Sequence, residues 1–251
     1  MSRSPTAKAN PFDRGRGRRT EVAGNLGEQA YRQIRTEILF YRLPPGSRIS
    51  EASLTQRFSL RQAAVRSALQ RLMQEGLVEK ADERNLRVAP LTLKDVQDIY
   101  ALRIIVEPRA AELAAAAGLP TPALERLRNI AQSSYEVTSH AQLVKFLSAN
   151  REFSLIVASA AGNSRLLATI ASLQDLTLRV LYLGIRSLNV SEWFQSMHSQ
   201  IVDAVAARNG ALASKLWITD LSYGARIISD ALVTLPEVSG VNLGGVALLA
   251  K

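Results

Sequence analysis

Apolar residues recur at helical spacing along most of this chain. The first such stretch runs over 26–41, and the helix breakers Pro44, Pro45 and Gly46 follow it. Beyond these breakers the pattern shortens, and two apolar runs flank a polar turn, which is typical of a hairpin. The elements predicted after the breakers are helices over 50–57 and 61–75 and strands over 77–79 and 86–88.

From position 92 onward the pattern predicts helices alone. Thr92 is placed to cap the first of them, with Asp95 at the reciprocal position of a capping box. Neither the alternation of a strand nor a strand–helix–strand rhythm occurs in this part. The predicted helices run over 92–117, 121–138, 141–160, 164–187, 191–208 and 210–233.

These two patterns divide the chain into modules. Three helices followed by a hairpin form a winged helix-turn-helix layout. The predicted fold class is therefore mainly α, with a winged helix-turn-helix domain ahead of an antiparallel six-helix bundle. The predicted parts are a disordered basic tail over 1–22, the winged domain over 23–90, the helical domain over 91–233 and a C-terminal tail over 234–251.

Charge separates the same two modules. The chain of 251 residues has a net charge of +9. Residues 1–90 hold 17 Lys and Arg against 9 Asp and Glu, so nearly all the excess lies in the first module. Arginine supplies 25 of the 31 cations, and its planar guanidinium suits phosphates and base edges. The asymmetry indicates a nucleic-acid-binding module joined to a neutral module with another task.

Composition excludes several kinds of site. The chain has no cysteine, which removes disulfides, thiolate zinc sites, iron–sulfur clusters and cysteine nucleophiles. His140 and His198 are its two histidines, so a three-histidine metal site is impossible. No apolar run approaches the ~20 residues that span a bilayer, and the N-terminus is polar and basic. We therefore expect a soluble cytoplasmic protein with no membrane partner.

Several motifs resemble one family of regulators. Residues 43–51 resemble a PPG-x-R-L-S-E turn, and 64–72 resemble PVREAL-x-x-L, with Gly76-Leu77-Val78 at the expected place. Further along, residues 100–107, 146–163 and 198–201 resemble the opening helix, the F-L-x-x-D-x-x-F-H…SGN segment and the H-x-x-I motif of an effector domain. By these motifs the chain is similar to GntR-type transcription regulators of the FadR-like subfamily, which carry an FCD domain. The resemblance covers about Leu26 to Leu232.

The helix over 61–75 is the predicted recognition helix. Its spacing buries Val65, Leu69 and Leu72 and turns Arg66 and Gln70 outward. Such a helix fits the major groove, where arginine reads guanine and glutamine reads adenine.

Gln62 departs from the family pattern, which has an arginine at this position. Arg61 lies one residue earlier and points in a different direction. Gln62 can read adenine in place of guanine. Alternatively, Ser59 and Gln62 form a capping box, which would turn the Gln62 side chain onto the backbone.

The wing also differs from the family pattern. Its tip is Arg84-Asn85, where relatives often have Arg-Gly. Asparagine tolerates a positive φ, and the arginine suits a phosphate or minor-groove contact. Arg35 and Arg48 suit phosphate contacts or surface ion pairs. The candidate DNA contacts are Arg35, Arg48, Arg61, Gln62, Arg66, Gln70, Arg84 and Asn85.

In the helical domain, the resemblance implies a ligand site. Many relatives hold a divalent metal there with one aspartate and three histidines, and these positions correspond here to Asn150, Ser154, His198 and Asp220. Asn150 and Ser154 share one helical face but are poor metal ligands. We therefore expect a polar pocket with no metal and no cofactor.

Arg103 lies where the subfamily often has an arginine facing the ligand. A buried guanidinium needs a partner, which an acidic effector would supply by bidentate contact. The alternative is an ion pair with Glu107, one turn along the same helix.

These expectations combine into one function. We expect a homodimeric, non-enzymatic DNA-binding regulator that reads a palindromic operator and responds to a small effector with a carboxylate or a phosphate. One alternative is a DNA-binding dimer with no effector. The other is a metal-dependent sensor or enzyme-like helical domain.

Overall fold

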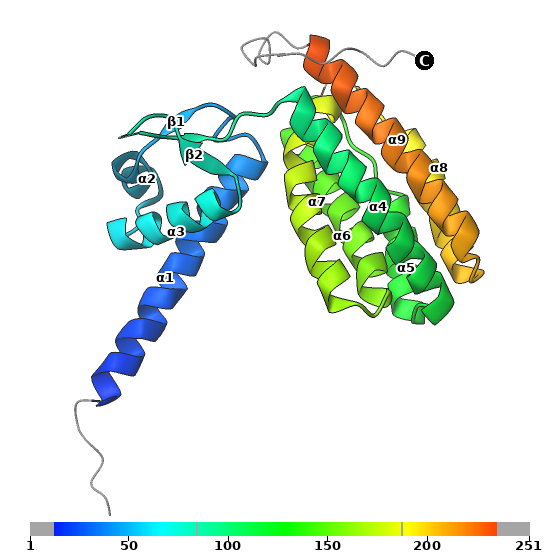
Figure 1. The fold of residues 1–251 in the computed structure, drawn as a ribbon, viewed down its shortest axis with the longest axis horizontal. Coiled ribbons are helices and arrows are strands. Elements are labelled where there is room, and N and C mark those ends of the chain that lie inside the picture. Colours follow the sequence, from blue (N-terminus) through cyan, green and yellow to red (C-terminus); the bar gives the residue numbers. More distant parts are fainter. Residues whose placement is uncertain (1–12, 84, 187, 235–251) are drawn as a thin grey trace, which may run out of the picture. The chain divides into compact units, whose positions relative to one another are not determined.

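The computed structural model describes residues 13–83, 85–186 and 188–234 (Figure 1). The chain forms two compact units. The N-terminal unit comprises residues 1–38 and 42–89, and the helical unit comprises 39–41 and 90–251. The predicted tail over 234–251 lies outside the described residues, apart from Thr234.

The N-terminal unit has the predicted order of helices and hairpin. It contains α1 (Asp13–Leu39), β1 (Arg48–Ile49), α2 (Glu51–Phe58), α3 (Gln62–Gln74), β2 (Val78–Lys80) and β3 (Leu86–Val88). The strands form an antiparallel sheet of order β1-β3-β2. Sequence analysis missed β1, which has only two residues. Ser50 caps α2 through a reciprocal capping box with Ser53.

Helix α1 begins earlier than predicted. Its first turns, from Asp13, lie in the segment that was predicted to be a disordered tail over 1–22. Once the stretch over 26–39 is helical, each added residue gains a hydrogen bond without a new nucleation cost, and arginine is a good helix former. Residues 1–12 lie outside the described part of the chain.

The core of the N-terminal unit confirms the predicted stripe of α3. Val65, Leu69 and Leu72 are buried, as are Ile34 and Ile38 of α1 in the same unit.

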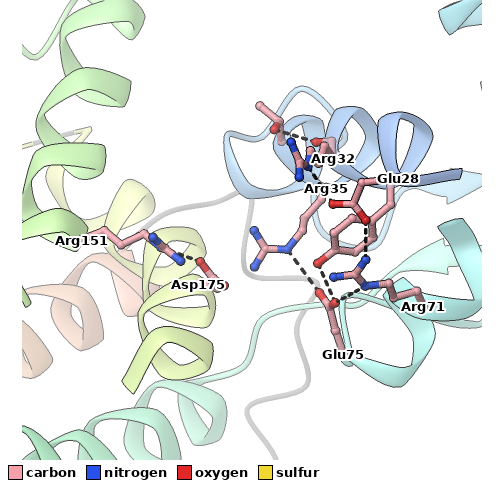
Figure 2. Close-up of polar contacts among 9 residues, drawn as sticks. Glu28, Arg32, Arg35, Arg71, Glu75, Arg151 and Asp175 are labelled. Atoms are coloured by element: carbon pink, nitrogen blue, oxygen red, sulfur yellow. Dashed lines mark hydrogen bonds and ion pairs between the residues drawn. The ribbon is translucent and has the colours of Figure 1, made fainter. Parts of the chain in front are cut away.

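A polar cluster ties α1 to α3 beside this core (Figure 2). Glu75 accepts a hydrogen bond from Arg35 at 3.2 Å, and Glu28 accepts one from Arg71 at 2.9 Å. The Arg71 guanidinium lies 3.5 Å from the centroid of the Tyr31 ring, a close cation–π contact. The cluster fixes α3 on α1, so that the outer face of α3 has a rigid support.

The helical unit consists of a bundle of helices, as predicted. These are α4 (Leu93–Ala117), α5 (Thr121–Ala131), α6 (His140–Ala160), α7 (Ser164–Ile185), α8 (Ser191–Ala206) and α9 (Gly210–Thr234). Thr92 and Asp95 form the predicted capping box at the start of α4. Arg151 of α6 pairs with Asp175 of α7 at 2.7 Å (Figure 2).

Helix α5 ends at Ala131, seven residues before the predicted end. The buried Tyr135 explains the early stop, because its polar atoms bind the segment between α7 and α8. Its hydroxyl donates to the Leu188 carbonyl at 2.7 Å, and its N–H donates to the Ser191 hydroxyl at 3.3 Å. These tertiary hydrogen bonds outweigh the helical pattern of residues 132–138.

Helices α4 and α9 pack antiparallel and closely. Trp217 of α9 donates to Glu107 of α4 at 2.9 Å, and Gly224 lies against Tyr100. A Cβ atom at Gly224 would come within 3.0 Å of the Tyr100 hydroxyl, so this approach requires glycine.

Helix α7 is long and apolar enough to cross a membrane by length and composition alone. Half of its apolar window is buried inside the helical unit, as in the core helix of a soluble protein.

Candidate nucleic-acid interface and buried polar site

The outer face of α3 presents the side chains that the helical spacing predicted. Arg61, Gln62, Arg66 and Gln70 are all exposed. The first residues of a recognition helix are the ones that reach base edges in a major groove. This face can therefore contact DNA without unfolding any part of the core.

Glu51, at the start of α2, holds two of these side chains. Its carboxylate accepts two hydrogen bonds from Arg66, both at 2.9 Å, and a longer one from Gln62 at 3.4 Å. The hydrogen bond and charge of Arg66 lower the pKa of Glu51, and Glu51 in turn raises the pKa of Arg66. Sequence analysis missed Glu51, because it lies 15 residues away and no local pattern links it to Arg66.

The alternative capping box of Gln62 does not form. Ser59 is the left-handed C-cap of α2, with φ 53°, and Arg61 is the N-cap of α3 without a side-chain hydrogen bond. The Gln62 side chain consequently lies away from the helix backbone and beside Arg66.

The remaining candidate DNA contacts differ in their surroundings. Arg35 is mostly buried and paired with Glu75, which matches its alternative as an ion-pair partner. Arg48 is exposed on β1. At the wing, Asn85 donates to both carboxylate oxygens of Asp82, at 2.9 and 2.8 Å, and Arg84 lies outside the described residues.

In the helical unit, Arg103 forms the alternative ion pair. Its guanidinium donates to both carboxylate oxygens of Glu107, at 2.6 and 3.2 Å. Gln174 and Trp217 donate to the same carboxylate at 3.0 and 2.9 Å. Burial by itself lowers the pKa of Arg103, but the charge and hydrogen bond of Glu107, together with Tyr100 and Asp220, raise the pKa above its ordinary value. The buried charges thus neutralise one another inside the bundle.

The four positions that correspond to the family's metal ligands meet in the same interior. Asn150 and Ser154 lie one turn apart on α6, His198 lies on α8 and Asp220 on α9. The His198 ring stacks on Phe153 with centroids 4.1 Å apart, and its Nε2 is 3.7 Å from Asp220 Oδ2. Asp220 also accepts a hydrogen bond from Trp193 at 3.1 Å.

Two of these buried polar side chains lack hydrogen bonds. Asn150 is 8 % exposed and Ser154 is 5 % exposed, yet neither side chain bonds to any described residue. His198 is 5 % exposed, and the polar contact of its ring among the described residues is the one with Asp220. Asn150 and His198 line one cavity of about 10 Å³. The Asn150, Ser154 and His198 side chains therefore have hydrogen-bonding positions available for a polar group that enters this interior.

The donor set does not fit a divalent metal. Within the described residues no three His, Cys, Asp or Glu side chains are grouped as metal ligands. His198 and Asp220 are good ligands, but the Asn150 amide and the Ser154 hydroxyl are weak neutral donors. The four side chains are better suited to hydrogen bonds with an organic molecule.

A larger groove lies between α5 and α6, with a volume of about 890 Å³. Lys145, Arg126 and Glu152 line it together with several small polar residues. Arg126 is paired with Glu152 at 2.7 Å, whereas Lys145 is exposed and forms no ion pair with a described residue. Sequence analysis missed this groove, because the α5–α6 packing that makes it leaves no local signature.

Comparison with known proteins gives matches in both units. A model of the gntR family of bacterial regulatory proteins matches residues 26–88, and a model of the FCD domain matches 98–222. The chain is 25 % identical over 209 residues to the HTH-type transcriptional repressor GlaR of Escherichia coli, covering 80 % of this chain and 95 % of GlaR. It is 40 % identical over 86 residues to the uncharacterized HTH-type transcriptional regulator YdhC of Bacillus subtilis, which is 34 % of this chain and 38 % of YdhC.

Solved structures share the fold. A putative GntR transcriptional regulator from Rhodococcus sp. RHA1 has a TM-score of 0.67 at 22 % identity, covering 87 % of this chain and 99 % of that one. McbR/YncC of E. coli has a TM-score of 0.66 at 18 % identity, covering 82 % and 97 %. At these identities the likeness concerns the fold.

Proposed function

The chain belongs to the GntR family of DNA-binding transcription regulators and carries an FCD domain, and from this premise we propose that a small acidic metabolite sets its affinity for an operator. The relatives are transcription regulators, not enzymes. Because a bacterial regulator must reach its operator DNA, the localisation that we propose is the cytoplasm.

The proposed operator contact is the outer face of α3. Arg66, Gln62 and Gln70 enter the major groove and read base edges, while Arg48 and Arg61 contact phosphates beside it. The wing residues Arg84 and Asn85 contact the backbone or the minor groove. The exposure of the α3 face and the +8 charge of residues 1–90 support this assignment.

The proposed assembly is a homodimer on a palindromic operator. Leu102 and Ile105 of α4 are 51 % and 69 % exposed, and Ile218 of α9 is 41 % exposed. The antiparallel contacts of α4 and α9 place Ile105 and Ile218 at the same level of the pair. A second copy that covers this apolar face would give the two-fold symmetry that a palindrome requires.

The observation that carries the effector proposal is the unpaired interior of the helical unit. Asn150 and Ser154 have no hydrogen bond among the described residues, and His198 has free hydrogen-bonding capacity. A carboxylate or phosphate oxygen would accept from the Asn150 amide, the Ser154 hydroxyl and an N–H of the His198 ring. A cavity of about 10 Å³ holds one water at most, so effector binding must open this interior.

The competing proposal is a DNA-binding dimer without an effector. The small cavity and the complete set of partners around Glu107 favour it. One experiment decides between the two. An operator is first selected from random duplexes, and its binding is then measured in the presence of a panel of carboxylates and phosphorylated metabolites.

The matched variant for this experiment is Asn150→Leu, which removes the polar group at nearly constant volume. A compound that changes the operator affinity of the wild type at least about tenfold, and of Asn150→Leu much less, supports the effector proposal. A full response in Asn150→Leu would remove the site from the mechanism. If no compound changes the affinity, the dimer without an effector is favoured.

A further inference from the structure

The α5–α6 groove and the buried polar site share a wall. Ile130, Ser133 and Phe146 line both the groove of about 890 Å³ and the cavity of about 10 Å³. Asn150 and His198 lie on the far side of that wall, in the small cavity. The wall therefore separates an open groove of ligand size from two polar side chains of the small cavity.

Phe146 is held in this wall by packing with other aromatic rings. Its ring packs on Tyr135 and Phe194, with centroids 4.6 and 5.2 Å apart, and Phe194 in turn packs edge-on against His198. These are aromatic contacts without hydrogen bonds, so a rotamer change of Phe146 breaks no polar interaction. Such a change would join the cavity to the groove.

The groove carries one uncompensated positive charge. Arg126 and Glu152 neutralise each other through a bidentate pair. Lys145 remains without an ion pair among the described residues, on the same helix as Asn150. Five residues of α6 separate Lys145 from Asn150, which is about 7.5 Å along the helix axis.

We propose that the α5–α6 groove is the binding site and entry route of a small organic anion, with Phe146 as its inner gate. The anionic end lies at Lys145, and a hydroxyl or carbonyl oxygen at the opposite end displaces Phe146 and bonds to Asn150 and His198. Because Lys145 and Asn150 are separated both along and around α6, a ligand that reaches both must be an elongated organic acid and not a compact one such as acetate. This proposal rests on the proposed function, because it supplies the route to the same interior.

The absence of native cysteine allows a test that needs no identified effector. A single thiol is introduced by Asn150→Cys behind the gate, by Ser148→Cys in the groove, or by Ser222→Cys on the exposed surface of α9. Each full-length variant is treated with an anionic reagent, 2-sulfonatoethyl methanethiosulfonate, and with a cationic one, 2-(trimethylammonium)ethyl methanethiosulfonate. The rate of modification is followed by mass spectrometry.

The gate predicts a specific pattern of rates. Phe146→Ala accelerates modification of Asn150→Cys by about tenfold or more, because it removes the wall, and leaves Ser222→Cys unchanged. The matched control is Leu143→Ala, which truncates a buried residue of the same helix that lines neither the groove nor the cavity. Equal acceleration by both truncations, or none by Phe146→Ala, would overturn the route. If Phe146→Ala unfolds the unit, Phe146→Val gives the same test with less lost volume.

The charge preference is tested separately. The anionic reagent should react several-fold faster than the cationic one at Ser148→Cys, and Lys145→Gln should abolish this difference. Lys215→Gln on α9 changes the net charge equally and should preserve it. If both reagents modify Ser148→Cys at the same rate while Lys145 is unchanged, the anion preference is overturned. These modification rates do not depend on operator binding. The groove proposal can therefore fail while the operator assay supports the proposed function, and the proposed function can fail while the groove proposal holds.

Discussion

The N-terminal unit and the helical unit keep their candidate binding residues in opposite states. On α3, Arg66 is exposed and already paired with the Glu51 carboxylate. Inside the helical unit, Asn150 and Ser154 are buried and lack hydrogen bonds. Exposed ion pairs contribute little to stability, whereas the two interior side chains still have donors and acceptors available for a ligand.

This difference separates two ways of preparing a binding site. DNA can take Arg66 from Glu51 at little cost, because both groups face water in the free protein. A ligand of the interior would instead fill hydrogen-bonding positions that no described residue occupies. The surface is thus suited to readily exchanged contacts, and the interior to a ligand that shifts the stability of the helical unit.

The largest expected effect concerns the buried Arg103–Glu107 pair of the helical unit. Glu107→Gln leaves Arg103 buried without its countercharge while nearly conserving volume, so we expect a loss of about 3–5 kcal/mol in the free energy of unfolding. Chemical denaturation followed by circular dichroism measures it. The control is Asp98→Asn, which breaks the exposed Lys94–Asp98 pair of the same helix and should change stability by less than about 0.5 kcal/mol. Similar losses in both variants would mean that burial does not distinguish the pairs.

The next effect concerns the surface of α3. Arg66→Ala should weaken binding to the selected operator by about tenfold to a hundredfold, while binding to random DNA changes little. Gln62→Ala should mainly relax the base preference at one position. Arg165→Ala, which removes an exposed arginine of α7, is the control for the charge change. An equal loss of affinity for operator and for random DNA would show that Arg66 contacts a phosphate and not a base.

A smaller effect with the opposite sign is expected at Asn150. Asn150→Leu replaces an amide that bonds to no described residue by an apolar group of similar size, and we expect stability to rise by about 1 kcal/mol because apolar surface is buried in its place. The same variant should lose its response to effectors, since stability and function compete at such a position. Thermal denaturation measures the change in stability, and the operator assay measures the response to effectors. A destabilised Asn150→Leu protein would show that the amide is satisfied in the folded state, and the contrast between the two units would then disappear.

Sequence patterns predicted the elements whose signals are local. The 3.6-residue period alone placed Val65, Leu69 and Leu72 in the core and Arg66 and Gln70 outside. The end of α5 was missed, because the hydrogen bonds that hold Tyr135 join it to residues more than 50 positions away. The start of α1 was missed for the converse reason, since residues 13–25 extend an existing helix without an apolar pattern of their own.

The same division holds for the sites. The Arg103–Glu107 pair could be anticipated from its i, i+4 spacing, but the contribution of Trp217 could not, because 110 residues separate it from Glu107. Family resemblance gave the set of Asn150, Ser154, His198 and Asp220, and the structure brings these residues into one interior. Neither spacing nor resemblance pointed to Glu51 as the partner of Arg66.

The smallest expected effect is a shift in the titration of Glu51. In the free protein the hydrogen bond and charge of Arg66 lower the pKa of Glu51 below its ordinary value of 4.5. The ion pair therefore stabilises the folded protein above pH 4.5. This stabilisation is lost as the pH falls through the lowered pKa. When DNA withdraws Arg66, the carboxylate loses this partner and faces phosphates, and its pKa rises. The complex therefore binds the proton at a higher pH than the free protein does, and operator affinity increases as the pH falls between the two pKa values.

Side-chain carboxyl NMR with and without operator measures both pKa values of Glu51. Glu28, whose pKa Arg32 and Arg71 lower away from the outer face of α3, is the control. An unchanged Glu51 pKa in the complex would mean that Arg66 stays on Glu51 when DNA binds, and that the surface pair is as fixed as the buried one.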